Sequence, residues 1–215
     1  MSLVHEDMMP FYWDSLKIPG LVRKRTPMDG SCFFHAICDS FYDRYKQAKL
    51  GNTQLSPGQI VSTLRKELAD KLGSKVNPLI SNSPTFYDIL SRGKLKDFGK
   101  DLKTYSLPAL QEWLASNRSV DNAFNEFISN LLGKDIYILD YNKKDVYITG
   151  DDMDLLYSQR PGIVLLYLQS SEQNGVGHYE LVGRVSRGKI ITMFDPNDPL
   201  ILQIQDRMRS KLEKG

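Results

Sequence analysis

The chain has 215 residues, of which 41% are hydrophobic, and its 28 basic residues nearly balance 26 acidic ones to give a net charge of +2. This length suits one domain with a full core, and Lys and Arg scattered among acids exclude a protein that binds nucleic acid through a basic face. The longest apolar stretch, 163–168, is far shorter than the ~20 residues needed to cross a bilayer, which excludes a membrane-spanning protein.

The first part of the chain is expected to alternate between loops and helices. Residues 1–20 are mixed, and their aromatic cluster at 11–13 is compatible with a short helix packed on the domain. Residues 21–25 predict a short edge strand. In 32–47 apolar residues recur at a spacing of three to four, which predicts a helix, and 48–55 is polar and loop-like.

The middle of the chain is predicted to be helical. Ser56 followed by Pro57 is typical of a helix start, and Gly73 is typical of its end. The buried face of this helix is expected to consist of Ile60, Leu64, Leu68 and Leu72. Further helices are expected at 85–91, 93–103, 108–116 and 120–132.

The second half changes to residues that favour strands. Strands are predicted at 135–141, 146–149, 162–169, 178–185 and 189–194. The last two flank a Ser-Arg-Gly turn and are expected to form a hairpin, and 198–212 is expected to be a final helix. Helices first and strands later, with short connections, predict an α+β fold: a mostly antiparallel central sheet flanked by helices.

Cys32 lies at a position where a thiol can be activated as a nucleophile. The turn-forming run 29–31 (Asp-Gly-Ser) delivers Cys32 to the start of the predicted helix. The first N–H groups of a helix have no partner within the helix and carry the positive end of its dipole. Such surroundings lower a thiol pKa from about 8.5 to roughly 3.5–7.5 at activated sites. The sequence therefore indicates a cysteine enzyme.

The second cysteine, Cys38, is expected to be a core residue. On one helix its Cα would lie about 9 Å from that of Cys32, beyond the ~7 Å that a disulfide allows. Two cysteines and three histidines also fall short of a convincing zinc site. Because no disulfide is expected and 1–13 lacks the pattern of a secretory signal, we expect a cytoplasmic protein.

A thiol nucleophile needs a base, and His178 is the best of three candidates. His5 is close to the terminus, and His35 lies on the same predicted helix as the cysteine, where it is expected to be partly exposed. His178 opens a predicted strand after a loop that contains Gly175 and Gly177. The missing side chains of these glycines permit close approach of another backbone.

Strand alternation places a carboxylate beside this histidine. Glu180 and His178 share one face of the strand, and Tyr179 lies on the other. A carboxylate two residues on is able to orient the imidazole and stabilise its cationic form, as the third member of a catalytic triad does.

These motifs resemble those of a known family. The run 29–34 (Asp-Gly-Ser-Cys-Phe-Phe) resembles the Asp-Gly-x-Cys-aromatic motif of the ovarian-tumour (OTU) family of cysteine proteases, and 178–180 (His-Tyr-Glu) is similar to its His-aromatic-acid/amide motif. The run 130–139 resembles the helix and strand that precede this histidine. Order and spacing agree over 20–195. The resemblance implies an OTU-like fold with an N-terminal extension, a catalytic domain and a C-terminal helical extension at 1–20, 21–195 and 196–215.

OTU proteins are deubiquitinases that cleave the isopeptide bond between the ubiquitin C-terminus and a lysine, without a metal or cofactor. The resemblance implies that Cys32 is the nucleophile, His178 the base and then the acid, and Glu180 the residue that orients it. It also implies ubiquitin or polyubiquitin as partner, with the distal ubiquitin bound by the helical region 56–130. The implied oxyanion-hole groups are the amides of Asp29, Gly30 and Cys32, and the implied substrate-binding residues are Gly175, Gly177 and Tyr179.

Two positions depart from the family pattern. The residue three after the nucleophile is commonly Arg, but here it is His35. The third member is usually Asp or Asn, and Glu180 is one methylene longer, so Asn174 and Asp29 are alternatives for the orienting role. The tail 193–199 and the helix after it resemble an extension of some large-DNA-virus members, which implies a pathogen protein acting in host cytoplasm.

Two other functions remain open from the sequence. Specificity lies in surface contacts, so a deconjugase for another ubiquitin-like modifier would have the same motifs. A catalytically inactive ubiquitin-binding module is the third hypothesis, and the presence of both Cys32 and His178 speaks against it.

Overall fold

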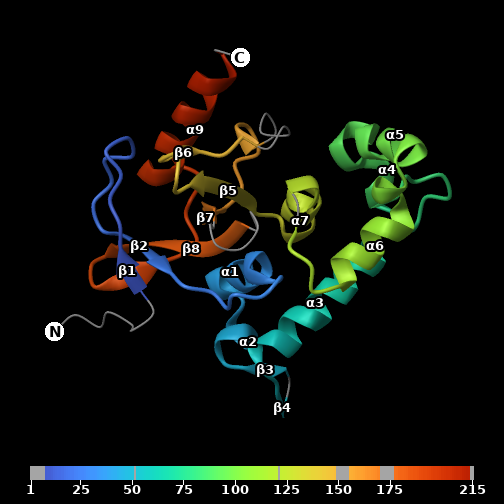
Figure 1. Cartoon of the computed structure of the whole chain (residues 1–215), viewed down its shortest axis with the longest axis horizontal. Coiled ribbons are helices and arrows are strands. Elements are labelled where there is room, and N and C mark those ends of the chain that lie inside the picture. Colours follow the sequence, from blue (N-terminus) through green and yellow to red (C-terminus); the bar gives the residue numbers. More distant parts are fainter. Residues whose placement is uncertain (1–7, 51, 121, 149–154, 170–176, 214–215) are drawn as a thin grey trace.

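The computed structural model describes residues 8–50, 52–120, 122–148, 155–169 and 177–213. A central sheet lies between a large helical layer and the C-terminal helix (Figure 1). Its strands are β1 Met8–Pro10, β2 Leu21–Lys24, β5 Asp135–Asp140, β6 Asp145–Val146, β7 Gly162–Gln169, β8 Gly177–Ser186 and β9 Lys189–Ile191. The helices are α1 Cys32–Phe41, α2 Asp43–Lys46, α3 Pro57–Leu72, α4 Phe86–Ile89, α5 Lys94–Asp101, α6 Leu107–Ala115, α7 Asn125–Leu132 and α9 Pro199–Leu212.

The sheet is mostly antiparallel, as the sequence predicts. Its strand order is β1-β2-β8-β7-β5-β6, with β9 paired to β8. Only β5 and β7 run parallel among the described strands, with Ile138 opposite Leu165. The neighbouring pair β7 and β8 is antiparallel, with Leu168 opposite His178. The register therefore brings the start of β8 to the end of β7.

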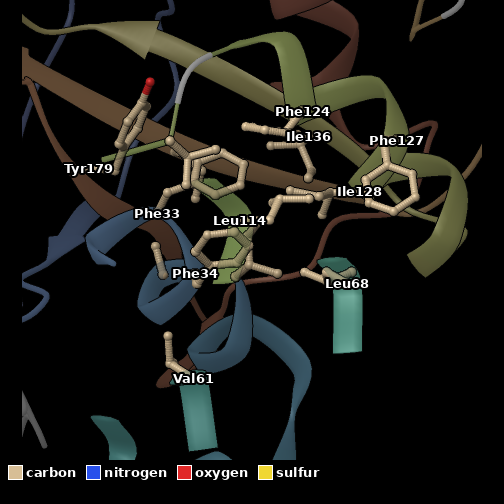
Figure 2. Packing of buried hydrophobic residues seen from close by; sticks show 14 of the residues in the cluster. Phe33, Phe34, Val61, Leu68, Leu114, Phe124, Phe127, Ile128, Ile136 and Tyr179 are labelled. Carbon is tan, nitrogen blue, oxygen red and sulfur yellow. The ribbon is translucent and has the colours of Figure 1, made fainter. Parts of the chain in front are cut away.

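The two faces of the sheet bury alternate residues of the same strands. In β5, Ile136 and Ile138 face the helical layer, whereas Tyr137 and Leu139 pack on the opposite side. The strand is buried on both faces, which is why its inner residues, 136–139, are all apolar or aromatic. Figure 2 shows part of the core on the helical side, where residues of α1, α3, α6, α7 and the sheet meet.

The helical layer is built on α1, which packs against β8. Helix α3 begins with a capping box, in which the Ser56 hydroxyl accepts from the Gln59 N–H at 3.2 Å and the Gln59 side chain accepts from the Ser56 N–H at 2.8 Å. Helix α6 packs along α3, and the two extend away from the sheet toward α4 and α5 (Figure 1). We call α3 to α6 the helical arm.

The C-terminal helix α9 covers the other face of the sheet. Its side chains Leu200, Ile201, Ile204 and Met208 are buried in the core on that side. Asp198 caps its first turn by accepting from the Leu200 N–H at 2.9 Å, and the Arg184 guanidinium of β8 holds the same carboxylate at 2.6 and 2.9 Å. In the described part of the chain no helix is long and apolar enough to cross a membrane.

The N-terminal segment also packs on the sheet. Instead of a helix near 11–13, the structure has β1 followed by a turn, and the Trp13 side chain is buried in the same core as α9. Strand β2 is not an edge strand as predicted, because β1 pairs with its outer side. The division into extensions and catalytic domain stays a prediction.

Two local predictions near the first helices are wrong. The helix expected over 32–47 is broken at Tyr42, whose ψ of 100° is extended, so that α1 and α2 are separate. The expected loop 48–55 contains a small hairpin of β3 Lys49–Leu50 and β4 Thr53–Gln54. Apolar spacing across 32–47 does not reveal the break, because it continues on both sides of it.

Helix α9 should contribute to the stability of the whole fold. We expect Leu200→Ala to lower the free energy of unfolding by about 2–5 kcal/mol, because this side chain is completely buried. Leu202→Ala is the matched control: that side chain is 43% exposed, so the change should stay within about 0.5 kcal/mol. Denaturant unfolding of both variants measures the difference. Equal effects would show that α9 unfolds separately from the sheet.

Candidate active site

Cys32 lies at the first position of α1, as the sequence predicts. We call residues 29–31, which lead into this helix, the Cys32 loop. The preceding residue, Ser31, is the N-cap but does not cap the helix with its side chain. The first amides of α1 therefore have no side-chain cap and lie beside the thiol, where they favour negative charge.

The Cys32 loop is held by its own aspartate and packed against a second loop. The Asp29 carboxylate accepts from the Ser31 N–H at 2.8 Å, and the Asp29 carbonyl accepts from the Cys32 N–H at 3.3 Å. A Cβ added at Gly30 would lie 1.5 Å from the carbonyl oxygen of Asn117, so only glycine fits there. The Cys32 amide, one of the three predicted to stabilise the oxyanion, therefore already donates to the Asp29 carbonyl in this structure.

His35 is completely buried, which corrects the expectation of a partly exposed residue. Its Nε2 lies 3.1 Å from the Asp29 carboxylate, and its Nδ1 lies 2.7 Å from the hydroxyl of Tyr45. The side chain of His35 points back along α1 to the Cys32 loop. It therefore holds in place the carboxylate that accepts from the Ser31 N–H.

The Cys32 thiol lies against the strand that carries the candidate base. The backbone N–H of Tyr179 points to Sγ at 3.4 Å. Burial is the largest influence and raises the thiol pKa above its ordinary value, although N–H groups of Tyr179, Phe33 and Cys32 itself lower it. In this structure the thiol pKa is therefore not lowered, contrary to the expectation from its helix position, because desolvation outweighs the amides.

His178 lies at the second position of β8, is half-buried, and directly precedes the residue whose backbone N–H points to the thiol. Its Nε2 lies 3.5 Å from the Thr26 hydroxyl and 4.0 Å from the Glu180 carboxylate. Both partners are at Nε2, which leaves Nδ1 as the nitrogen able to accept the proton of Cys32. Burial lowers the His178 pKa, and the charge of Asp29 raises it to a smaller extent.

Glu180 shares a strand face with His178 but is also paired elsewhere. Its carboxylate is buried and lies 3.4 Å from the Arg23 guanidinium. Burial raises the Glu180 pKa, and the charges of Arg23 and Arg25 lower it. Because 4.0 Å to the ring exceeds hydrogen-bond distance, Glu180 makes no hydrogen bond to His178 in this structure.

Thr26 contacts the His178 ring, which the sequence did not predict. Its hydroxyl donates to the Tyr179 carbonyl at 2.6 Å and lies closer to the His178 ring than Glu180 does. Since its proton is used in that bond, its lone pairs face Nε2 as acceptors. A threonine after a strand, outside both motifs although only three residues before Asp29, carries no sequence signal for this role.

The predicted substrate-binding residues lie in different environments. The Tyr179 ring is buried against Phe33 and Tyr167, so this residue reaches the thiol with its backbone rather than its side chain. Gly177 has the ring of Tyr167 at its Cα, since an added Cβ would lie 1.9 Å from it. Gly175 and the alternative orienting residue Asn174 lie outside the described residues.

Both cysteines are free, as their spacing predicts, and both are buried. Cys38 lies in the core on the helical side, where burial raises its pKa to about 12. Such a thiol is protonated and unreactive at neutral pH. Cys32 is therefore the candidate nucleophile, because it lies at the helix start and against the strand that carries His178.

Comparison with known proteins identifies the fold. The sequence matches no protein-family model, and no curated protein matches it. Among solved structures it is similar to one described as "Structure of Ovarian Tumor (OTU) domain in complex with Ubiquitin". The two share 17% sequence identity and a TM-score of 0.51, over 87% of this chain and 81% of that chain. The chain thus has an OTU-like α+β fold, which confirms the predicted fold class.

The raised thiol pKa predicts slow alkylation of the resting protein. In a Cys38→Ala background, iodoacetamide should modify Cys32 slowly at neutral pH, and the midpoint of its pH–rate profile should lie above that of an ordinary thiol, because deprotonation is opposed by burial. The unfolded protein, with an ordinary thiol, should react with a midpoint near pH 8.5. Mass spectrometry of timed samples gives both profiles. A rate already maximal at pH 6–7 would show that the thiolate–imidazolium pair exists before substrate binds.

Proposed function

We propose that this protein is a cysteine-type deubiquitinase that hydrolyses isopeptide bonds at the C-terminus of ubiquitin. The observation that carries the proposal is the meeting of two motifs far apart in sequence: Cys32 at the start of α1 lies against the backbone of Tyr179, next to His178 on β8. The OTU-like fold supports it, and the similar OTU domain was solved in complex with ubiquitin.

The proposed reaction begins with the thiol proton. His178 Nδ1 takes this proton, and Sγ attacks the carbonyl carbon of the last ubiquitin glycine, so that a C–S bond forms and the oxygen becomes an anion. The amides at the Cys32 loop and the first turn of α1 stabilise this anion. Imidazolium returns the proton to the lysine nitrogen as the C–N bond breaks. Water, activated by His178, then cleaves the thioester and releases the glycine carboxylate.

The resting geometry needs only a local change before the reaction. The Cys32 N–H is engaged with the Asp29 carbonyl at 3.3 Å, a long hydrogen bond that an oxyanion would displace. Catalytic contacts are often loose without substrate and tighten in the complex. We therefore expect substrate binding to bring Nδ1 to the thiol and to free this amide.

The substrate tail is Leu-Arg-Gly-Gly, and only a narrow channel would select it. Gly177 and Gly175 are proposed to line this channel, where side chains would block the passage of the glycines. The aromatic ring of Tyr167 packs against Gly177 and would form one side of this channel. An acidic residue should meet the arginine of the tail.

The helical arm offers an apolar surface for the globular part of ubiquitin. After α3, a loop presents three apolar side chains to solvent: Val76, Leu79 and Ile80 are 43%, 94% and 54% exposed. Backbone hydrogen bonds at each end hold this loop, including that of the Val76 N–H to Pro84 at 2.9 Å. Exposed apolar groups on an ordered loop are typical of a protein interface. This loop falls within the region 56–130 expected to bind the distal ubiquitin.

Replacing the nucleophile tests the proposal. The wild-type protein should release the fluorophore from a ubiquitin C-terminal amide and cleave di-ubiquitin, whereas Cys32→Ala should have no measurable turnover, because no other group supplies the attacking sulfur. His178→Ala should lose nearly as much, and Glu180→Ala should lose less. Binding of ubiquitin to Cys32→Ala, measured by titration calorimetry, should be largely intact. The matched control is Cys38→Ala, which should keep wild-type turnover.

The alternatives have different outcomes in the same assay. Turnover of another ubiquitin-like modifier but not of ubiquitin would identify a different deconjugase. Ubiquitin binding without turnover by folded wild-type protein would identify an inactive binding module. Full hydrolysis by Cys32→Ala would contradict the mechanism itself.

The Thr26 hydroxyl should support the His178 ring during turnover. Thr26→Val has the same shape but no acceptor for the Nε2 proton, so we expect kcat to fall about three- to tenfold, the value of one hydrogen bond. Thr26→Ser keeps the hydroxyl and should recover most of the loss. Steady-state kinetics with the ubiquitin amide measure both. An unchanged kcat for Thr26→Val would show that Thr26 does not help to orient the His178 ring, and Glu180 would be the remaining candidate for that role.

A further inference from the structure

Arg65 lies in the middle of α3 and is completely buried. It falls between the apolar positions Leu64 and Leu68 of the predicted helix face, and its guanidinium reaches inward rather than to solvent. The flat side of the group lies over the Phe34 ring, with 4.8 Å between the guanidinium carbon and the ring centre. A buried arginine is rare in proteins unless it is paired. Its surroundings therefore need an explanation.

All five N–H groups of this guanidinium donate hydrogen bonds. Three of them bind the end of α6 and the segment after it: Nε donates to the Leu114 carbonyl at 2.8 Å, and Nη2 donates to the carbonyls of Trp113 at 3.2 Å and Arg118 at 2.8 Å. Carbonyls at the end of a helix lack partners within it and carry partial negative charge. Arg65 thus binds α6 in the way that a cation caps a helix end.

The other two N–H groups reach the Cys32 loop. Nη1 donates to the Gly30 carbonyl at 3.0 Å and to the Ser31 hydroxyl at 2.8 Å. In a trans peptide the C=O and the following N–H point in opposite directions. The Gly30 carbonyl faces Arg65, so the Ser31 N–H faces away from it, toward the Asp29 carboxylate that accepts it at 2.8 Å. This peptide is therefore held at both its ends.

The partners of the guanidinium are uncharged oxygens. Burial lowers the Arg65 pKa to about 10, with a smaller opposite influence from Asp29 and Cys32, so the group is still charged at neutral pH. A buried cation held by dipoles alone contributes little to stability compared with an apolar side chain of similar size. Its planar guanidinium instead fixes the positions of several hydrogen-bond acceptors at once, because its five N–H groups point in fixed directions.

We propose that Arg65 is a positioning residue that holds the Cys32 loop in the orientation needed to stabilise the oxyanion. It acts through the Gly30 carbonyl and the Ser31 hydroxyl, and its other bonds tie this orientation to the helical arm. The backbone of Asn117 packs against Gly30 of the same loop, since its carbonyl oxygen leaves no space for a Cβ there. The inference rests on the proposed function, because the loop serves an oxyanion only if Cys32 attacks a carbonyl.

Arg65→Lys tests the inference, because it keeps the charge and loses the fork. In assays with the ubiquitin C-terminal amide we expect kcat to fall roughly 10- to 100-fold with KM within about twofold, as for misplaced catalytic groups. Ubiquitin aldehyde, which forms a tetrahedral adduct, should bind correspondingly more weakly. Ubiquitin itself should bind a Cys32→Ala protein equally well with and without Arg65→Lys. The matched control is Arg187→Lys, an exposed arginine of the β8–β9 turn, which should change none of these values.

A second variant, Ser31→Ala, tests the inference if the Arg65→Lys protein does not fold. Ser31→Ala removes one of the two loop acceptors and leaves the Gly30 carbonyl bound, so kcat should fall about threefold, a fraction of the larger loss. A rise in KM with unchanged kcat, in either folded variant, would assign Arg65 to substrate binding and overturn the inference.

Hydrogen exchange separates this inference from the proposed function. Without any substrate, Arg65→Lys should speed amide exchange at Ser31 and Cys32 at least tenfold, while exchange in the core strand β7 stays as in the wild type. This result would support the positioning role even if ubiquitin proved not to be the substrate. Unchanged exchange at these two amides would overturn it, whether or not the protein turns over ubiquitin.

Discussion

The peptide between Gly30 and Ser31 is the constraint on which the candidate site depends. Its carbonyl oxygen is bound by Arg65 at 3.0 Å, and its N–H is bound by the Asp29 carboxylate at 2.8 Å. His35 in turn holds that carboxylate from within α1. Because Cys32 is the next residue, the direction of this peptide sets where α1 begins and where the thiol lies. The nucleophile is thus placed by contacts with α3 and with its own helix, rather than by the loop alone.

The sheet supplies the other half of the site. Pairing with β7 fixes the start of β8, and pairing with β2 fixes the residues that follow, so that the Tyr179 backbone N–H faces the thiol and His178 directly precedes it. Thr26, just after β2, binds the Tyr179 carbonyl and faces the same ring. Residues separated by about 150 positions in the chain therefore meet through strand register. Burial raises the thiol pKa and lowers that of His178, so both groups are uncharged at neutral pH in this structure.

Much of the fold was predictable from the sequence, because local signals were strong. The Ser56–Pro57 start and Gly73 end define α3, and β7 has the predicted bounds, since capping residues and an apolar run are read locally. The placement of Cys32 at a helix start follows from the Asp-Gly-Ser turn in the same way. Tertiary partners were not predictable. The burial of His35 depends on Tyr45 and Asp29, and the pairing of β1 outside β2 depends on a segment without a strand pattern.

Arg65 and Glu180 show why residue type alone misleads at a site. A charged residue between apolar helix positions is ordinarily solvated, and only the folded neighbours of Arg65 show that carbonyls bind it. Glu180 has the spacing of an orienting carboxylate, but it lies 3.4 Å from Arg23 and 4.0 Å from His178. Its longer side chain reaches a cation on the neighbouring strand β2. Such competition between partners is set by distances that no sequence pattern contains.

The most direct test of the account is reaction with ubiquitin that carries an electrophile at its C-terminus, followed by peptide mass spectrometry. The account predicts one covalent adduct, located on Cys32 and absent from Cys38, because only the first thiol lies at a helix start and against the strand that carries the proposed base. An adduct on Cys38, or no adduct with folded protein at a concentration where ubiquitin binds, would contradict it.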